Sequence, residues 1–241
     1  MMDPEQLVIS DDPKHPANTI CSLCRDFYRK DWRLGTGGAV SIRDKEHNIC
    51  YITPSGVQKE LMSPTDMFVA SVAGSSGDIE YLRRPGNLKA SDCTPLFMTC
   101  YRELDDVGAI IHTHSENAVL ASMLNDKVVE ISHIEQLKAL PSDKLDPKTG
   151  KYRNLLFQET LKIPIIENKN FEYELTDSLL EICREYPRGC AVLVRRHGIF
   201  VWGPTVEKAK IYNESIDYLL GIWLRLYQLG VPIMKKHAES S

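Results

Sequence analysis

The chain has 241 residues, of which 43% are hydrophobic and 26% are charged, and its formal net charge is -4 at neutral pH. This composition is typical of a globular protein with a substantial core. The acidic balance, without any long run of lysine or arginine, argues against nucleic acid or an anionic membrane as a partner. The sequence has no apolar stretch of membrane-spanning length and no recognisable signal peptide, and its seven cysteines are irregularly spaced. We therefore expect a cytoplasmic protein with free thiols.

The first part of the chain predicts one helix and then several strands. Apolar residues recur at helical spacing over residues 17–30, and the glycine-rich segment GTGGAVSIR ends that helix. Residues 39–43 and 49–53 are typical of a hairpin, and residues 67–72 of a further strand. The segment CSLC at 21–24 has the spacing of two zinc ligands, but we favour two thiols that share the buried face of the helix.

In the middle of the chain, a threonine–proline pair begins an amphipathic helix over residues 94–104. The apolar segment 107–115 predicts a buried strand, and its last residue, Ser115, is the expected cap of a short helix that follows. Residues 144–154 are polar and resemble an inserted loop, which precedes a short strand over residues 163–166.

The last part of the chain predicts a helix over residues 175–186, two strands at 190–194 and 199–203, and a long amphipathic helix over residues 204–229. Strands and helices therefore alternate, but the two hairpin-like units argue against an all-parallel sheet. We expect one α/β domain with a mixed, largely antiparallel sheet that is covered by helices.

Two histidines one residue apart, His112 and His114, end the buried strand. Alternate side chains of a strand share a face, so both imidazoles point the same way and can reach one ion. Two ligands do not define a metal site, however, and the plainer alternative is a pair of partly exposed histidines at a strand end. A third candidate is His197, at the turn between two apolar strands. Three histidines with an open position are typical of catalytic zinc, although His197 could instead be a turn residue that bonds its own backbone.

Glu135, next to His133, is the carboxylate that we select for acid/base chemistry. The alternative is a solvated glutamate at a helix start. Asp92 and Glu116 compete with it, because the sequence does not give their distances from the histidines. Three turns rich in glycine, serine and threonine, at 36–41, 53–60 and 89–93, could hold a phosphate through backbone amides, hydroxyls and a lysine, although most such turns only reverse the chain.

The segments TGGAVS, YITPSGVQKE, CTPLF, IIHTHS and VLVRRHGIFVWG occur in this order and spacing. Together they resemble the class II aldolase/adducin family, over about residues 17–229. The resemblance implies a single three-layer α/β/α domain, usually in a homotetramer with the active site near a subunit boundary. We accordingly expect a catalytic domain over residues 17–230, a flexible N-terminal segment over residues 1–16 and a C-terminal tail over residues 231–241.

The resemblance also implies one Zn²⁺ per subunit, held by His112, His114 and His197, so that His133 is not a ligand. Aldolases of this family carry a catalytic glutamate in a Ser-Ser-Glu run, which here reads Ser91-Asp92-Cys93. The missing glutamate counts against aldol cleavage.

SGVQKE, CTPLF and RRHG instead resemble a branch of lyases that remove water from a phosphorylated methylthio-pentulose in methionine salvage. In that branch the residue matching Cys93 lies at the substrate, and the residue matching Glu135 is the acid/base. Phosphate contacts are then left to Gly37, Gly38, Ser55, Gly56, Ser91 and Lys59. Two alternatives stay open: an aldolase that cleaves a phosphorylated ketose, and a non-catalytic interaction module like the adducin head.

Overall fold

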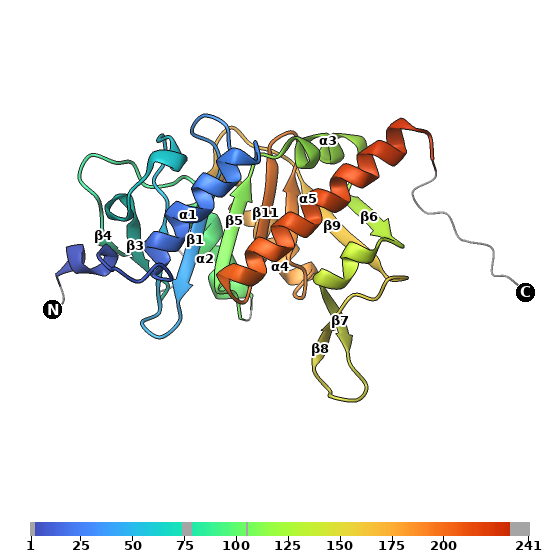
Figure 1. Ribbon diagram of the computed structural model, residues 1–241, viewed down its shortest axis with the longest axis horizontal. Coiled ribbons are helices and arrows are strands. Elements are labelled where there is room, and N and C mark those ends of the chain that lie inside the picture. Colours follow the sequence, from blue (N-terminus) through green and yellow to red (C-terminus); the bar gives the residue numbers. More distant parts are fainter. Residues whose placement is uncertain (1–2, 74–78, 105, 232–241) are drawn as a thin grey trace, which may run out of the picture.

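The centre of the molecule is a twisted sheet with helices on both faces, shown in Figure 1 for the computed structural model. The structure describes residues 3–73, 79–104 and 106–231. Within them, the main sheet has nine strands in the order β4-β3-β2-β1-β5-β11-β10-β9-β6. The strands are β1 (Ala39–Asp44), β2 (Ile49–Ile52), β3 (Phe68–Ser71), β4 (Tyr81–Arg83), β5 (Ala109–Thr113), β6 (Val128–Ser132), β9 (Thr160–Ile166), β10 (Ala191–Val194) and β11 (Gly198–Gly203).

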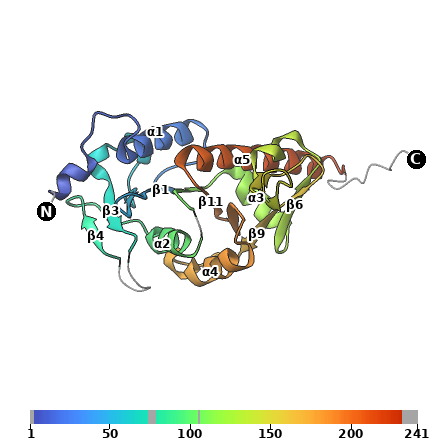
Figure 2. The ribbon, with the colours of Figure 1, turned by 90° about the horizontal axis from the view of Figure 1, so that it is seen from below.

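Neighbouring strands of this sheet are antiparallel, except that β9 and β10 run parallel. Five α-helices are described: α1 (Pro16–Arg29), α2 (Thr94–Glu103), α3 (Glu116–Leu124), α4 (Thr176–Glu185) and α5 (Val206–Gln228). Figure 2 shows α1, α3 and α5 on one face of the sheet and α2 and α4 on the other. The predicted three-layer α/β/α fold with a mixed, largely antiparallel sheet is confirmed.

The strands at the centre of the sheet are buried because both faces carry helices. Every residue of β5 is buried, including His112, and every residue of β10 and β11 is buried as well. Apolar side chains of β5 and β11 pack under α2 and α4 on one face and under α1 and α5 on the other. Such strands form continuous apolar runs in the sequence, which is why the sequence identifies them.

Short elements complete the fold. The 3-10 helices are Pro4–Val8, Lys59–Leu61, Pro64–Asp66, Glu135–Ala139 and Glu172–Leu175. Val8 is fully buried, so the described residues 4–8 of the segment that we expected to be flexible pack on the domain. Of the expected C-terminal tail, residues 232–241 lie outside the described residues. None of the helices in the described ranges combines the length and the apolarity that a membrane crossing requires.

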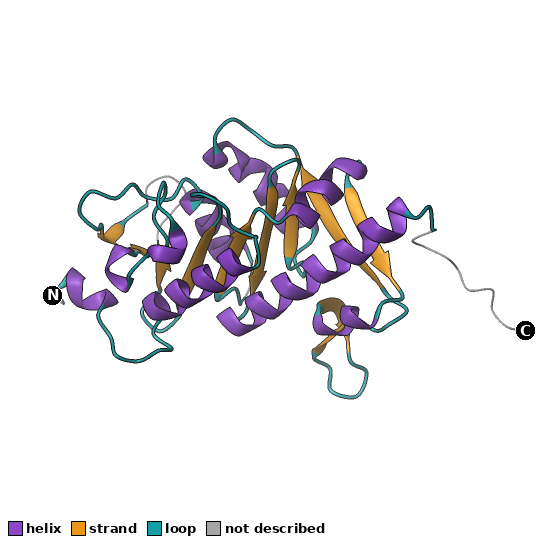
Figure 3. Cartoon of the chain, turned by 45° about the horizontal axis from the view of Figure 1, so that its top comes forward, coloured by secondary structure: helices purple, strands orange, loops and turns teal. Residues whose placement is uncertain are grey.

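The segment 144–154 corrects the sequence analysis. Its ends belong to a hairpin of β7 (Pro141–Leu145) and β8 (Tyr152–Asn154), which projects from the body of the molecule (Figure 3). The polar composition hid these strands because most of their side chains are exposed. By contrast, Cys21 and Cys24 lie on the buried face of α1, as predicted.

Candidate metal centre

The three histidines selected from the sequence meet at one end of the sheet. His112 lies in β5, and His114 directly follows Thr113, the last residue of that strand. His197 lies in the turn between β10 and β11, and β11 pairs with β5. The Nε2 atoms of His112 and His114 are 3.0 Å apart, and those of His114 and His197 are 3.1 Å apart. Three imidazoles thus present their Nε2 atoms to one point.

The outer nitrogens of two of these rings are held by oxygen atoms. His112 Nδ1 lies 3.0 Å from the carbonyl oxygen of Ile199, and His197 Nδ1 lies 3.2 Å from Oδ1 of Asn168. An oxygen acceptor requires an N–H donor, so each Nδ1 carries a hydrogen while the Nε2 atom of the same ring is directed at the centre. This arrangement of outer partners is typical of metal-binding histidines.

A carboxylate that the sequence analysis did not select, Glu172, completes the cluster. Its Oε1 lies 3.6 Å from His112 Nε2 and 3.4 Å from His197 Nε2. One ligand atom from each of His112, His114, Glu172 and His197 can be chosen so that all lie within 4.8 Å of one another. Three imidazole nitrogens and one carboxylate oxygen are ligand types that bind zinc, so this donor set fits a divalent metal ion.

Burial and mutual proximity favour the metal-binding protonation states. Burial, with the neighbouring imidazoles, lowers the pKa of His114 to about 2. Burial also lowers the pKa of His112. Although burial pushes the pKa of Glu172 upward, contacts with His112 and His197 bring it well below the usual range of a glutamate. Both imidazoles are therefore neutral and the carboxylate ionised at physiological pH.

Cys93 lies directly beside this cluster. It precedes α2, it is buried, and its Sγ donates a hydrogen bond of 2.6 Å to Oε2 of Glu172. Burial and the charge of Glu172 raise the pKa of the thiol well above its ordinary value, so Cys93 stays protonated. The family resemblance implies that Cys93 lies at the substrate, and the structure places it beside the candidate metal centre.

The glycine turn before β1 packs against two of the histidines. A Cβ atom on Gly37 would lie 2.6 Å from His114 Nδ1, and one on Gly38 would lie 2.7 Å from the carbonyl oxygen of His112. Gly38 also has a φ of 72°, a conformation that favours glycine. The turn can approach the histidines this closely only because it lacks side chains.

The other candidate phosphate contacts lie around the same turn. Lys59 is buried, and its Nζ donates a hydrogen bond of 2.5 Å to the carbonyl oxygen of Thr36. Burial lowers the pKa of Lys59, while the charge of Glu172 is close enough to raise it. The Ser55 amide bonds the Lys89 carbonyl oxygen at 2.9 Å, which joins the 53–60 and 89–93 turns.

Two further candidates fit the same group of turns. Gly56 follows Ser55 and has a φ of 70° with open space at its Cβ position. Ser91 is buried, and its Oγ accepts a hydrogen bond of 3.2 Å from the Cys93 amide. The three turns predicted from composition therefore converge near the histidines.

The buried side chain of Arg33 holds the backbone next to the histidines in place. Arg33 donates to the carbonyl oxygens of Ala39 and His112 at 2.6 and 3.0 Å and to Cys24 Sγ at 3.1 Å. Its guanidinium bridges the start of β1 to the histidine strand. Nothing in the sequence pattern singled out Arg33, because its role depends on the register between two distant strands.

Glu135 lies elsewhere in the molecule. Ser132, the last residue of β6, pairs with Thr160, the first residue of β9. The other end of β9 lies beside the end of β10, close to His197. Six residues of extended strand span about 20 Å, so Glu135 lies at the opposite end of the sheet from the histidines of its own chain. Its side chain is 76% exposed and pairs with Lys138 at 2.9 Å.

His133 and the competing carboxylates are also separate from the cluster. His133 bonds Ser132 Oγ at 3.0 Å and packs against Phe157, at the same end of the sheet as Glu135. Asp92 pairs with Lys89, and Glu116 is exposed in the first turn of α3.

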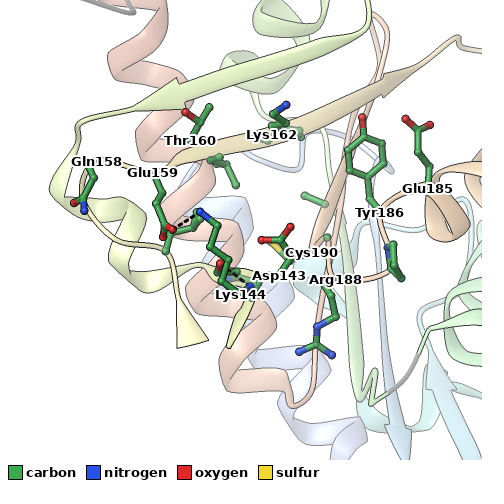
Figure 4. A pocket seen from close by; sticks show the side chains of 18 residues that line it. Asp143, Lys144, Gln158, Glu159, Thr160, Lys162, Glu185, Tyr186, Arg188 and Cys190 are labelled. Carbon is green, nitrogen blue, oxygen red and sulfur yellow. Dashed lines mark hydrogen bonds and ion pairs between the residues drawn. The ribbon is translucent and has the colours of Figure 1, made fainter. Parts of the chain in front are cut away.

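A large cavity, of about 660 Å³, lies far from the histidines, between the β7–β8 hairpin, β9 and the turn before β10 (Figure 4). Charged side chains of both signs line it, among them Asp143, Lys144, Glu159, Lys162 and Arg188. Among the described residues, the group of side chains that could hold a metal ion is the histidine cluster, and none of its members lines this cavity. We therefore place the chemistry at the histidine cluster and not in this cavity.

Comparison with known proteins identifies the family of this chain. A family model described as "Class II Aldolase and Adducin N-terminal domain" matches residues 18–224. The methylthioribulose-1-phosphate dehydratase of Saccharomyces cerevisiae (strain ATCC 204508 / S288c) is 53% identical, with 96% of this chain and 93% of that protein covered. The dehydratase of the same name from Komagataella phaffii is 54% identical, with 97% and 92% covered.

Solved structures agree on the fold. An L-fuculose 1-phosphate aldolase superposes with a TM-score of 0.69 at 20% identity, covering 95% of this chain and 93% of that chain. The L-fuculose-1-phosphate aldolase of Thermus thermophilus gives a TM-score of 0.63 at 21% identity, covering 88% and 96%. The chain therefore belongs to the class II aldolase and adducin N-terminal domain family.

Proposed function

We propose that this protein is a methylthioribulose-1-phosphate dehydratase of methionine salvage. This hydro-lyase converts 5-methylthioribulose 1-phosphate to 2,3-diketo-5-methylthiopentyl 1-phosphate and water. The observation that carries the proposal is the histidine cluster with Cys93 beside it, where an aldolase of the family has a glutamate. The identity to dehydratases over almost the whole chain supports the same reaction.

The proposed metal is Zn²⁺, one per subunit, held by His112, His114 and His197. When bound, it would supply Lewis acidity for the negative charge that develops on the substrate's oxygens. The substrate phosphate would lie in the turns that hold Gly37, Gly38, Ser55, Gly56, Ser91 and Lys59. Backbone amides and a buried lysine suit a phosphate dianion. Cys93 would contact the bound sugar from the start of α2.

Glu135 is the proposed acid/base. It would take the proton from C3 of the sugar and return one to the departing C4 hydroxyl, and the resulting enol would tautomerise to the diketone. Such a group contributes about 10²–10⁴-fold to a rate. Because Glu135 lies at the opposite end of the sheet from the histidines of its own chain, a second copy must provide it.

The proposed assembly is a homotetramer in which each active site uses two subunits. The exposure of Glu135 suits this role. Glu135 begins the 3-10 helix that follows β6, the last strand of the sheet, so its carboxylate is open to a neighbouring subunit. The proposed location is the cytoplasm, because all seven cysteines are free and free thiols suit a reducing compartment.

The test combines metal analysis with identification of the product. Purified protein should contain one zinc per chain and should convert 5-methylthioribulose 1-phosphate to the diketone, detected by mass spectrometry. A two-carbon aldehyde among the products would identify an aldolase instead, and a zinc-loaded protein without turnover would favour an interaction module. Glu135→Gln should keep the zinc but lose turnover, and His197→Ala should lose stoichiometric zinc.

A further inference from the structure

We propose that Glu172 is the fourth protein ligand of the metal, and that substrate oxygens take its place when substrate binds. This inference rests on the metal site of the proposed function and deepens it. Glu172 thereby replaces the glutamate that aldolases of the family have at the position of Cys93 in the run Ser91-Asp92-Cys93. The carboxylate has moved from the start of α2 to the segment between β9 and α4.

The distances within the cluster carry the first step. Oε1 of Glu172 lies 3.6 Å from Nε2 of His112 and 3.4 Å from Nε2 of His197. Ligand atoms at about 2.0–2.1 Å from a tetrahedral ion are about 3.3–3.4 Å from one another. Oε1 of Glu172 therefore lies where a fourth ligand of the ion would lie.

The second step is that Glu172 is anchored. The thiol of Cys93 donates a hydrogen bond of 2.6 Å to Oε2 of Glu172, and Oε1 is directed at the histidines. One turn later Leu175 is fully buried in the core beneath α2 and α4, and it fixes the short 3-10 helix that carries Glu172. Phe171 and Tyr173 on either side are exposed, so Glu172 alone of the three is directed inward. A carboxylate with one oxygen held by Cys93 and the other directed at the histidines is suited to bind a metal through that second oxygen.

The third step concerns the substrate. A zinc ion with three histidines and one carboxylate has no open position in tetrahedral geometry, whereas catalysis requires one. Glu172 must therefore leave or the coordination must expand when the sugar binds. Until then, the carboxylate would exclude water and other anions from the metal.

The experiment compares the wild-type protein with Glu172→Gln, which keeps the shape and removes the charge. The control is Glu181→Gln, which removes an exposed carboxylate from α4. Competition with a chelator should show zinc affinity lowered on the order of 10- to 100-fold in Glu172→Gln and unchanged in Glu181→Gln. In the cobalt-substituted proteins, azide should alter the visible spectrum of Glu172→Gln at concentrations that leave the wild-type spectrum unchanged.

Equal zinc affinity and equal azide response in the wild type and Glu172→Gln would overturn the proposal while leaving the three-histidine site intact. Failure of the wild-type protein to bind zinc at all would instead overturn the proposed function. A crystal structure of the zinc-loaded wild type gives an independent readout that does not depend on how the variant folds. A Glu172 oxygen at about 2.0–2.2 Å from zinc supports the proposal, and a water molecule between them contradicts it.

Discussion

The thiol of Cys93 donates a hydrogen bond of 2.6 Å to the carboxylate of Glu172, across 79 residues of sequence. This bond joins the start of α2 to the segment after β9, next to the histidine cluster. Because burial and the charge of Glu172 raise the pKa of the thiol, Cys93 acts here as a hydrogen-bond donor and not as a thiolate nucleophile.

Two substitutions of Cys93 should show whether its hydrogen bond to Glu172 affects zinc affinity. Cys93→Ser retains a donor and should keep zinc affinity close to that of the wild type. Cys93→Ala leaves Oε2 of Glu172 without this donor, so its zinc affinity should fall, by about 10-fold if the bond orients Glu172 as outer partners orient metal ligands. Chelator competition on both variants measures the difference. An alanine variant with wild-type affinity would show that the thiol does not position Glu172.

The packing of Gly37 against His114 gives a second prediction. In Gly37→Ala the new methyl group would meet His114 Nδ1 at 2.6 Å, so the ring must move and zinc affinity should fall by about 10-fold or more. Gly35→Ala is the matched control, because its Cβ meets nothing within 4 Å and its φ of 61° strains an alanine. We expect the control to lose about 1–2 kcal/mol of stability and to keep its zinc affinity, as measured by urea unfolding and chelator competition.

The sequence alone predicts the parts of this molecule that depend on local pattern. Alternation along a strand places His112 and His114 on one face, and the apolar runs predict the buried strands. The β7–β8 hairpin escaped prediction because its exposed strands lack an apolar pattern.

Glu172 escaped prediction for a different reason. It follows the strand 160–166, and only the parallel pairing of β9 with β10 brings it to the end of the sheet where His197 lies. A polar segment after a buried strand was the one available signal. The distance of Glu135 from the histidines likewise depends on the antiparallel register of β6 with β9.

The stability of the metal-free protein should depend on pH through His114. Its pKa is about 2 in the folded chain, against about 6.5 in an unfolded one, so below pH 6.5 the unfolded chain binds a proton that the folded chain does not. The free energy of unfolding therefore decreases as the pH falls. For this group the decrease is about 2 kcal/mol at pH 5. Urea unfolding at pH 7 and pH 5, with chelator present, should show this extra loss in the wild type and not in His114→Gln. Parallel losses in both proteins would contradict it.

The shared active site can be tested with mixed oligomers. Homo-oligomers of Glu135→Gln and of His197→Ala should both be inactive, the first without its acid/base and the second without its metal. If a second copy provides Glu135, a mixed oligomer contains sites that pair the intact histidines of one subunit with the intact Glu135 of another.

Co-expression of the two variants with different tags, followed by purification on both tags, should therefore restore about a quarter of wild-type activity, since one in four random pairings is intact. A mixture of His112→Ala with His197→Ala is the control, because each subunit lacks a metal ligand and no pairing repairs it. Absence of recovery in the first mixture, with mixed oligomers verified by mass spectrometry, would mean that Glu135 does not act across a subunit boundary. Its position at the opposite end of the sheet from the histidines of its own chain would then exclude it from the reaction altogether.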